Sequence, residues 1–121
     1  MRSSEFVETY DLHDSGLDEI TVDKDNKIVR MRIDLCNWLQ EDYVEKEPEI
    51  KPIELVFSAV TKMENTDRAI DEAFGVEFVS VDVETDGVFH AELVTATQEY
   101  YEIRIRAEDV RVFERETKNV E

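Results

Sequence analysis

The sequence is poor in the residues that crosslink chains or interrupt regular structure. It has one cysteine, three glycines and two prolines among 121 residues. The single cysteine, Cys36, excludes an internal disulfide framework. No apolar run reaches the roughly 18 residues of a membrane-spanning helix, and the N-terminal stretch MRSSE lacks the apolar core of a signal peptide. We therefore expect a cytoplasmic protein that does not contact a membrane.

Basic residues are also scarce relative to acidic residues. The chain carries 14 Lys and Arg against 31 Asp and Glu, so its net charge is −17. A small soluble domain needs a net charge of only about 2–8 in magnitude. This excess argues against direct binding to nucleic acid, whose phosphates are negative. Hydrophobic residues make up 41% of the chain, which is enough to build a core and argues against general disorder.

The acidic residues gather in two segments. Between Ala69 and Ile103 there are nine acidic residues and no lysine or arginine. A second acidic segment, from Glu41 to Glu49, separates two apolar stretches. An acidic run is often only a solvated surface. A run that has no basic residue and belongs to structured strands instead favours a surface that binds a basic protein, and both interpretations stay open.

Apolar and polar residues alternate along most of the chain, which is typical of half-buried strands. Strands are expected around residues 20–22, 29–35, 53–59, 76–84, 88–96, 100–107 and 109–114. Only residues 66–74 depart from this alternation, and they predict a short helix that ends at Gly75. The sequence thus predicts one β-rich domain over residues 1–121. We expect an antiparallel β-meander of six to seven strands, as a curled sheet or a sandwich, with one short helix.

The hairpin before residue 90 can be placed in register from the same alternation. A three-residue loop over 85–87 keeps the apolar residues of both strands on one face, and the glycine at its third position suits the left-handed conformation that such a loop requires. The outer face then pairs Asp82 with His90 and Ser80 with Glu92. The sequence therefore predicts a histidine–carboxylate contact on the surface of this hairpin.

The pairing with the following strand is predicted in the same way. Placing Leu93 opposite Ile103 keeps apolar residues together and puts His90 beside Arg106 on the outer face. Exposed cross-strand ion pairs of this kind contribute only about 0.2–1 kcal/mol each. We expect them to select the register of the strands more than to stabilise the fold.

The residues typical of catalytic and metal sites are few. Two histidines, His13 and His90, are too few for a three-histidine zinc site, so we expect no metal and no cofactor, although a mixed histidine–carboxylate site stays open. The neighbours His13, Asp14 and Ser15 are the residue types of a hydrolytic triad, but neighbours on an extended chain point in different directions. We expect them to form a turn in which Asp14 or Ser15 accepts backbone N–H groups, and Cys36 to be buried. The protein is therefore expected to be non-enzymatic, with no catalytic residues.

Two aromatic residues lie near the acidic segment at 41–49. Alternation places Trp38 on the face opposite the apolar residues of the preceding strand, and Tyr43 lies within the acidic segment. Aromatic residues in a polar rim are common anchors of protein interfaces, although Trp38 could instead cover a second small core beneath the 40–50 loop. The candidate partner-binding residues are Trp38, Glu41, Asp42, Tyr43, Asp82, Glu84, His90 and Glu92.

The segment from Phe6 to Ile20, with its Leu12-His13-Asp14-Ser15 stretch, has a familiar pattern when it is taken with the strand at 52–57. It resembles small acidic bacterial proteins of uncharacterised or immunity type. In those families a Leu-His-Asp-Ser/Ala segment leads into a β-meander, and some members neutralise polymorphic toxins. The resemblance implies an inhibitor that covers a basic toxin, such as a nuclease.

The leading hypothesis is therefore a non-enzymatic acidic module that binds a basic protein, with no direct contact to nucleic acid. Charge complementarity would steer such a module to a basic cleft. Three alternatives stay open: a nucleic-acid mimic that acts on a DNA-binding protein, a small-molecule-binding β-barrel-like protein, and a metal-assisted enzyme that uses His13 or His90.

Overall fold

The computed structural model describes residues 1–40, 43–44, 49–65, 76–84, 86–95 and 98–114. Its elements are α1 (Ser3–Thr9), β1 (Gly16–Asp23), β2 (Ile28–Cys36), the 3-10 helix η1 (Asn37–Leu39), β3 (Ile50–Ser58), β4 (Lys62–Asn65), β5 (Val76–Val83), β6 (Phe89–Val94), β7 (Tyr100–Arg106) and β8 (Asp109–Glu114). Within this part of the chain, the strands form one antiparallel sheet in the order β4-β7-β6-β5-β1-β2-β3-β8.

The mainly β, antiparallel character of the fold is confirmed, but the number of strands is not. The described sheet has eight strands rather than six or seven. The additional strand is β4, in which Met63 pairs with Ile105 of β7. Four residues with one inward apolar side chain are too short to produce a recognisable alternation. The helix expected at 66–74 lies outside the described residues.

The short α-helix in the described residues is α1, at the N-terminus, where the sequence predicts none. Its apolar residues are Phe6 and Val7, too few to define a helical periodicity. The helix is held by packing instead: Phe6 is fully buried, and its ring lies 6.2 Å from that of Phe89, measured between centroids. None of the described helices is long and apolar enough to cross a membrane.

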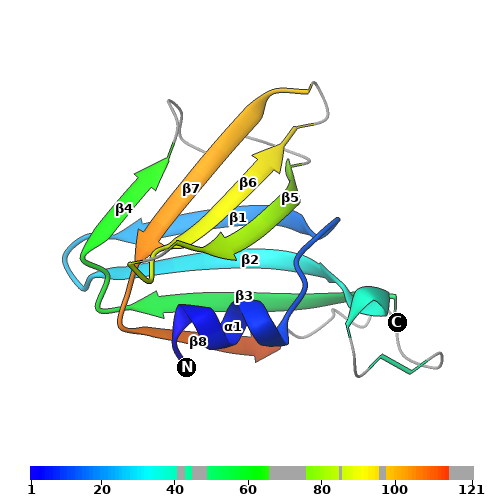
Figure 1. Ribbon diagram of the computed structural model, residues 1–121, viewed down its shortest axis with the longest axis horizontal. Coiled ribbons are helices and arrows are strands. Elements are labelled where there is room, and N and C mark those ends of the chain that lie inside the picture. Colours follow the sequence, from blue (N-terminus) through cyan, green and yellow to red (C-terminus); the bar gives the residue numbers. More distant parts are fainter. Residues whose placement is uncertain (41–42, 45–48, 66–75, 85, 96–97, 115–121) are drawn as a thin grey trace, which may run out of the picture.

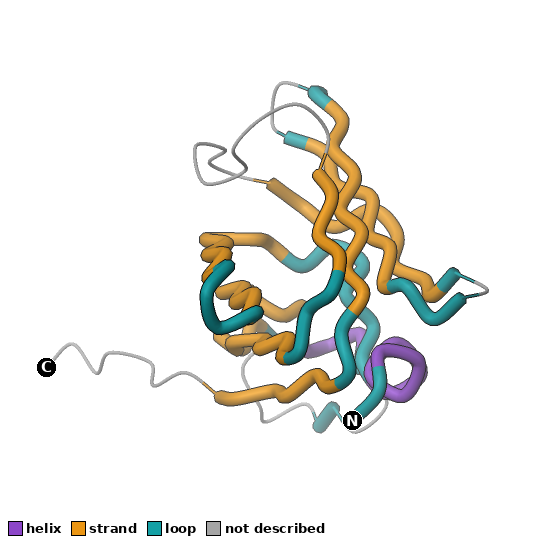
Figure 2. Tube along the Cα trace, turned by 90° about the vertical axis from the view of Figure 1, so that its left-hand side faces the viewer, coloured by secondary structure: helices purple, strands orange, loops and turns teal. Residues whose placement is uncertain are grey.

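The sheet consists of two four-stranded halves. The first half contains β1, β2, β3 and β8, and the second half contains β5, β6, β7 and β4. The halves meet along a short β1–β5 ladder at Gly16 and Leu17. Figure 1 shows that the strands of the second half cross those of the first at an angle, and Figure 2 shows the two sets from the side. The rings of Phe57 in β3 and Phe89 in β6 lie 5.1 Å apart between centroids. Because β3 and β6 are not neighbours in the sheet, the inner faces of the two halves must pack against each other.

One hydrophobic core fills the space between the halves, and α1 contributes to it. The helix packs against β5 in the second half and β8 in the first. The N-terminal ammonium group of Met1 donates to Oδ1 of Asp109 at 2.7 Å, and the N–H of Val110 donates to the carbonyl of Met1 at 2.7 Å. The N-terminal segment therefore holds the two halves together from one side.

Candidate functional site

The outward side chains of β5, β6 and β7 form a polar surface. Their inward neighbours, such as Ala91 and Ile103, are fully buried, so the alternation of the strands directs the polar residues to the opposite side. We name this surface the acidic face. It consists of Ser80, Asp82, Glu84, His90, Glu92, Tyr100, Glu102 and Arg104.

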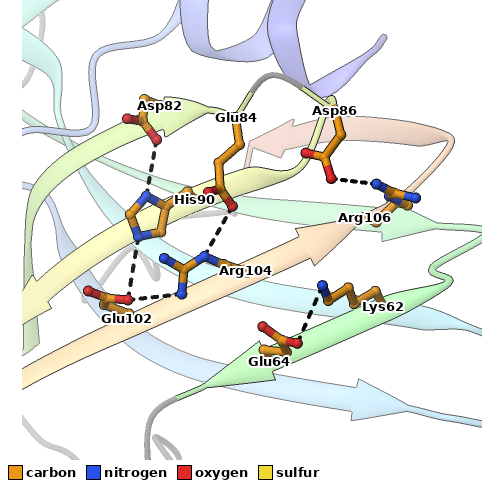
Figure 3. Close-up of polar contacts among 9 residues, drawn as sticks. All are labelled: Lys62, Glu64, Asp82, Glu84, Asp86, His90, Glu102, Arg104 and Arg106. Carbon is orange, nitrogen blue, oxygen red and sulfur yellow. Dashed lines mark hydrogen bonds and ion pairs between the residues drawn. The ribbon is translucent and has the colours of Figure 1, made fainter.

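The expected register of the β5–β6 hairpin is confirmed from the loop as far as Ser80, beyond which a β-bulge shifts the pairing and places Phe78 opposite Leu93. Asp82 lies opposite His90, and Ser80 lies opposite Glu92. Nδ1 of His90 is 3.2 Å from Oδ1 of Asp82, and the Ser80 hydroxyl donates to Glu92 at 3.1 Å. Gly87 has the left-handed φ of 84° that the loop requires. Figure 3 shows the imidazole of His90 directed at Asp82 on the neighbouring strand.

The expected register between β6 and β7 is wrong. Leu93 lies opposite Tyr101 rather than Ile103, so His90 lies opposite Arg104 instead of the arginine two residues further along. A shift of two residues keeps every side chain on the same face of the sheet, so the alternation does not distinguish the two registers.

The observed register places basic side chains among the acidic residues. Arg104 donates from Nε to Glu84 at 3.0 Å and from Nη1 to Glu102 at 2.9 Å (Figure 3). Beside the acidic face, Arg106 donates to Asp86 at 2.6 Å. The acidic face still carries four carboxylates against one guanidinium, so its charge is −3 with His90 neutral. The nine-acid run is therefore partly neutralised by arginines that follow it in the sequence.

Glu92 is held by two hydroxyl groups. The Tyr100 hydroxyl donates to its carboxylate and the Ser80 hydroxyl adds a second hydrogen bond, which together lower the pKa of Glu92. The same contact raises the pKa of Tyr100 to about 12, because the proton is shared with an anion. Glu92 is thus kept ionised in a defined orientation.

The aromatic candidates lie on a different element from the acidic face. Trp38 belongs to η1, so the strand alternation that ends with β2 at Cys36 does not set its direction. Its side chain is 51% exposed, whereas Tyr43 is half-buried. Glu41 and Asp42 lie outside the described residues. The structure therefore brings together the candidates of β5 and β6, whereas Trp38 lies on η1 and Tyr43 follows η1 in the chain.

A surface cavity of about 450 Å³ lies where β5, η1 and the N-terminal segment meet. Its lining includes Ser80 and Val81 of β5, Leu39 of η1, the adjacent Gln40, and residues 7–13. Gln40 is nearly buried and is tied to this lining, because its amide accepts from the N–H of Asp11 at 2.9 Å. No pattern in the sequence indicates that Gln40 has a role at this cavity.

The turn expected at residues 13–15 is confirmed. Asp14 adopts a φ of 64°, and the buried Ser15 hydroxyl accepts the N–H of Cys36 at 2.8 Å. Cys36 is buried as expected, and burial raises the pKa of its thiol. Nδ1 of His13 lies 2.9 Å from the carbonyl of Val79, and this hydrogen bond raises the pKa of His13. The serine is thus occupied in holding the backbone, which leaves no hydrolytic triad at this turn.

No family model, no curated protein and no solved structure matches this chain. The resemblance to immunity-type proteins therefore remains a prediction from the residues at 6–20 and 52–57. The function is therefore inferred from the charged and exposed side chains of this chain.

Proposed function

We propose that this protein is a non-enzymatic acidic module that binds a basic protein through its acidic face. The partner class that we infer is a basic toxin, such as a nuclease, which the module would inhibit by covering its basic cleft. The observation that supports this function is the fixed arrangement of Asp82, Glu92 and Glu102 on three paired strands, with Glu84 directly after the first of them. Adjacent strands lie about 4.8 Å apart and alternate residues of one strand about 6.7 Å apart, so the charges form a rigid grid.

The rigid spacing of the carboxylates makes binding selective for partners with matching positive charges. A partner whose cationic groups match the positions of Asp82, Glu84 and Glu92 can pair with all of them at once. A disordered acidic tail would attract any basic surface equally. Complementary charge also steers the encounter and raises association rates by about 10- to 1,000-fold. The acidic face therefore supports fast and selective association.

Affinity also requires a contact that excludes water. Trp38 is the exposed tryptophan of the described residues, and tryptophan is enriched among residues that dominate binding energy. Ser80 of β5 and Leu39 of η1 line the same surface cavity, so η1 lies close to this part of β5. We infer that one partner contacts both regions, with charge acting at one end and Trp38 at the other.

The test begins with capture of binding proteins from the source organism, followed by kinetics with the purified partner at low and physiological ionic strength. The double variant Asp82→Lys with Glu92→Lys should slow association by at least about tenfold and weaken its dependence on salt. Trp38→Ala should mainly accelerate dissociation.

The matched control is Asp25→Lys with Glu108→Lys, which changes the net charge equally at two exposed positions outside the acidic face. If both double variants slow association to the same extent, only net charge matters and the acidic face is not the binding surface. The proposed function would be refuted if the partner is acidic, or if the association rate does not change with ionic strength.

A further inference from the structure

We propose that His90, Glu92 and Glu102 bind a divalent transition-metal ion, with Zn²⁺ as the ion that suits them best. One ligand atom from each of the three side chains lies within 4.8 Å of the others. This site lies within the acidic face, but its test is independent of the proposed function, because the test needs only the isolated chain. The sequence analysis expects no metal ion but leaves open a mixed histidine–carboxylate site.

The sheet register creates the cluster. His90 and Glu92 are two residues apart on β6, so both side chains point to the outer face, and Glu102 lies directly opposite Glu92 on β7. Two carboxylates directly opposite each other repel, which costs free energy in a sheet. A dication between them would convert this repulsion into attraction. The neighbouring strands thus supply three ligands without any rearrangement of the backbone.

The imidazole of His90 has one ring nitrogen available for a metal ion. Nε2 is buried and has no hydrogen-bond partner among the described residues. Its nearest carboxylate atom is Oε2 of Glu102 at 3.8 Å, which is too long for a hydrogen bond. Two ligands of one zinc ion, each about 2.1 Å from it at a tetrahedral angle, lie about 3.4 Å apart. The distance between Nε2 of His90 and Oε2 of Glu102 is therefore closer to that between two ligand atoms of one zinc ion than to that between a hydrogen-bond donor and its acceptor.

The other ring nitrogen is oriented as in protein metal sites. Nδ1 of His90 lies 3.2 Å from Oδ1 of Asp82 (Figure 3). When a carboxylate accepts the Nδ1 proton, the lone pair of the neutral ring resides on Nε2, the nitrogen that faces Glu102. Carboxylate–histidine–metal arrangements of this kind set the tautomer and raise the basicity of the ligand. Asp82 therefore acts as a positioning residue for the proposed site.

The positive charge of Arg104 repels a metal ion but does not prevent its binding. Its guanidinium already pairs with Glu102 and Glu84, so an ion must share Glu102 with it or displace it. Asp82, Glu84, Glu92 and Glu102 together outnumber this one cation, so the region attracts a dication. The nitrogen ligand selects against Mg²⁺ and Ca²⁺, which prefer oxygen, and favours ions that accept imidazole, such as Zn²⁺.

The test is titration of the untagged full chain with ZnCl₂ by isothermal calorimetry, in a buffer that does not chelate. We expect saturable binding of one ion per chain. His90→Gln should abolish this binding, and Asp82→Asn should weaken it by about 10- to 100-fold, because the ring loses its orienting acceptor. In the wild type, zinc should shift the NMR signal of Nε2 of His90.

His13→Gln is the matched control, because it removes the other histidine and leaves the cluster intact. It should bind zinc like the wild type. Circular dichroism of each variant without zinc establishes that it folds. If His90→Gln does not fold, Glu92→Gln is used in its place. Absence of saturable binding to the wild type would overturn the site, as would binding that survives His90→Gln or is lost in His13→Gln.

Discussion

The two halves of the sheet share one inner pattern and differ in their outer faces. Both direct alternate apolar residues into the common core. The cavities on the outer face of the first half are lined by charges of both signs: Glu19, Arg30, Arg32, Glu54 and Arg111. The acidic face of the second half has four carboxylates and one guanidinium. Because the inner residues build the fold, the outer residues are free to differ, and their difference identifies the surface suited to a cationic partner.

The ion pairs of the two halves also differ in environment. The Arg32–Glu19 pair of the first half is 3.5 Å long, and both side chains are more than half exposed. Arg104 in the second half reaches Glu102 at 2.9 Å, and both side chains are about 30% exposed. Pairs that are exposed contribute little to stability. Arg104 is therefore less exposed and more closely paired than Arg32, and it limits how acidic its surface becomes.

The largest expected effect comes from breaking the contact between the halves. Phe89 is fully buried and lies against Phe57 of the other half and Phe6 of α1. Phe89→Ala should lower the free energy of unfolding by about 3–5 kcal/mol, measured by urea denaturation. Phe113→Ala, at a half-exposed position, should change it by no more than about 0.5 kcal/mol. Similar losses in both variants would show that the halves do not depend on a shared core.

An intermediate effect is expected at the turn that connects the halves. The carbonyl of Ser15 accepts the N–H of Phe78 in the second half at 2.9 Å, while its hydroxyl accepts the N–H of Cys36 in the first. Ser15→Ala leaves that buried N–H unpaired and should cost about 1–3 kcal/mol of unfolding free energy. The exposed Ser80→Ala is the control and should cost much less. Equal costs would mean that the buried hydrogen bond does not hold the junction.

The smallest expected effect concerns the pH dependence of the acidic face. The folded pKa of Glu92 is lowered, chiefly by Tyr100, so its contribution to stability is present above the unfolded pKa and is lost as the pH falls through the folded value. Tyr100→Phe should raise the pKa of Glu92 toward 4.5 and reduce this acid-dependent loss. Carboxyl NMR titration measures the change. Asp23 in the first half, whose pKa is lowered by Asn26, is the internal reference and should not move.

The β5–β6 hairpin was predictable because its loop residue is recognisable. A glycine at the left-handed position selects the three-residue loop, and that loop determines the pairing of Asp82 with His90. The β6–β7 hairpin also has a left-handed loop residue, but it is Gln98, with a φ of 66°. The N–H of Thr95 donates to the carbonyl of Glu99 at 2.9 Å and closes this loop two residues earlier than expected. A glutamine does not indicate that conformation, so the second register could not be inferred.

The elements that the sequence analysis missed are short and depend on contacts made elsewhere in the chain. The helix α1 has too few apolar residues for a periodic pattern and forms where Phe6 enters a core built by distant strands. The strand β4 forms by pairing with β7, some forty residues later. Long, alternating segments such as β2 and β3 were predictable because their own residues specify one buried face.

In β2, β3, β6 and β7 the sequence by itself determined which side chains face the core and which face outward, because the period of a regular strand is a local property. It also determined the overall negative charge and the contact between Asp82 and His90. Only the tertiary structure decided that His90 lies opposite Arg104 and that Glu92 lies opposite Glu102. Two registers that differ by two residues bury the same faces, so long-range packing and loop closure had to choose between them. That choice placed Glu92 opposite Glu102 and so created the three-residue cluster that we propose binds zinc.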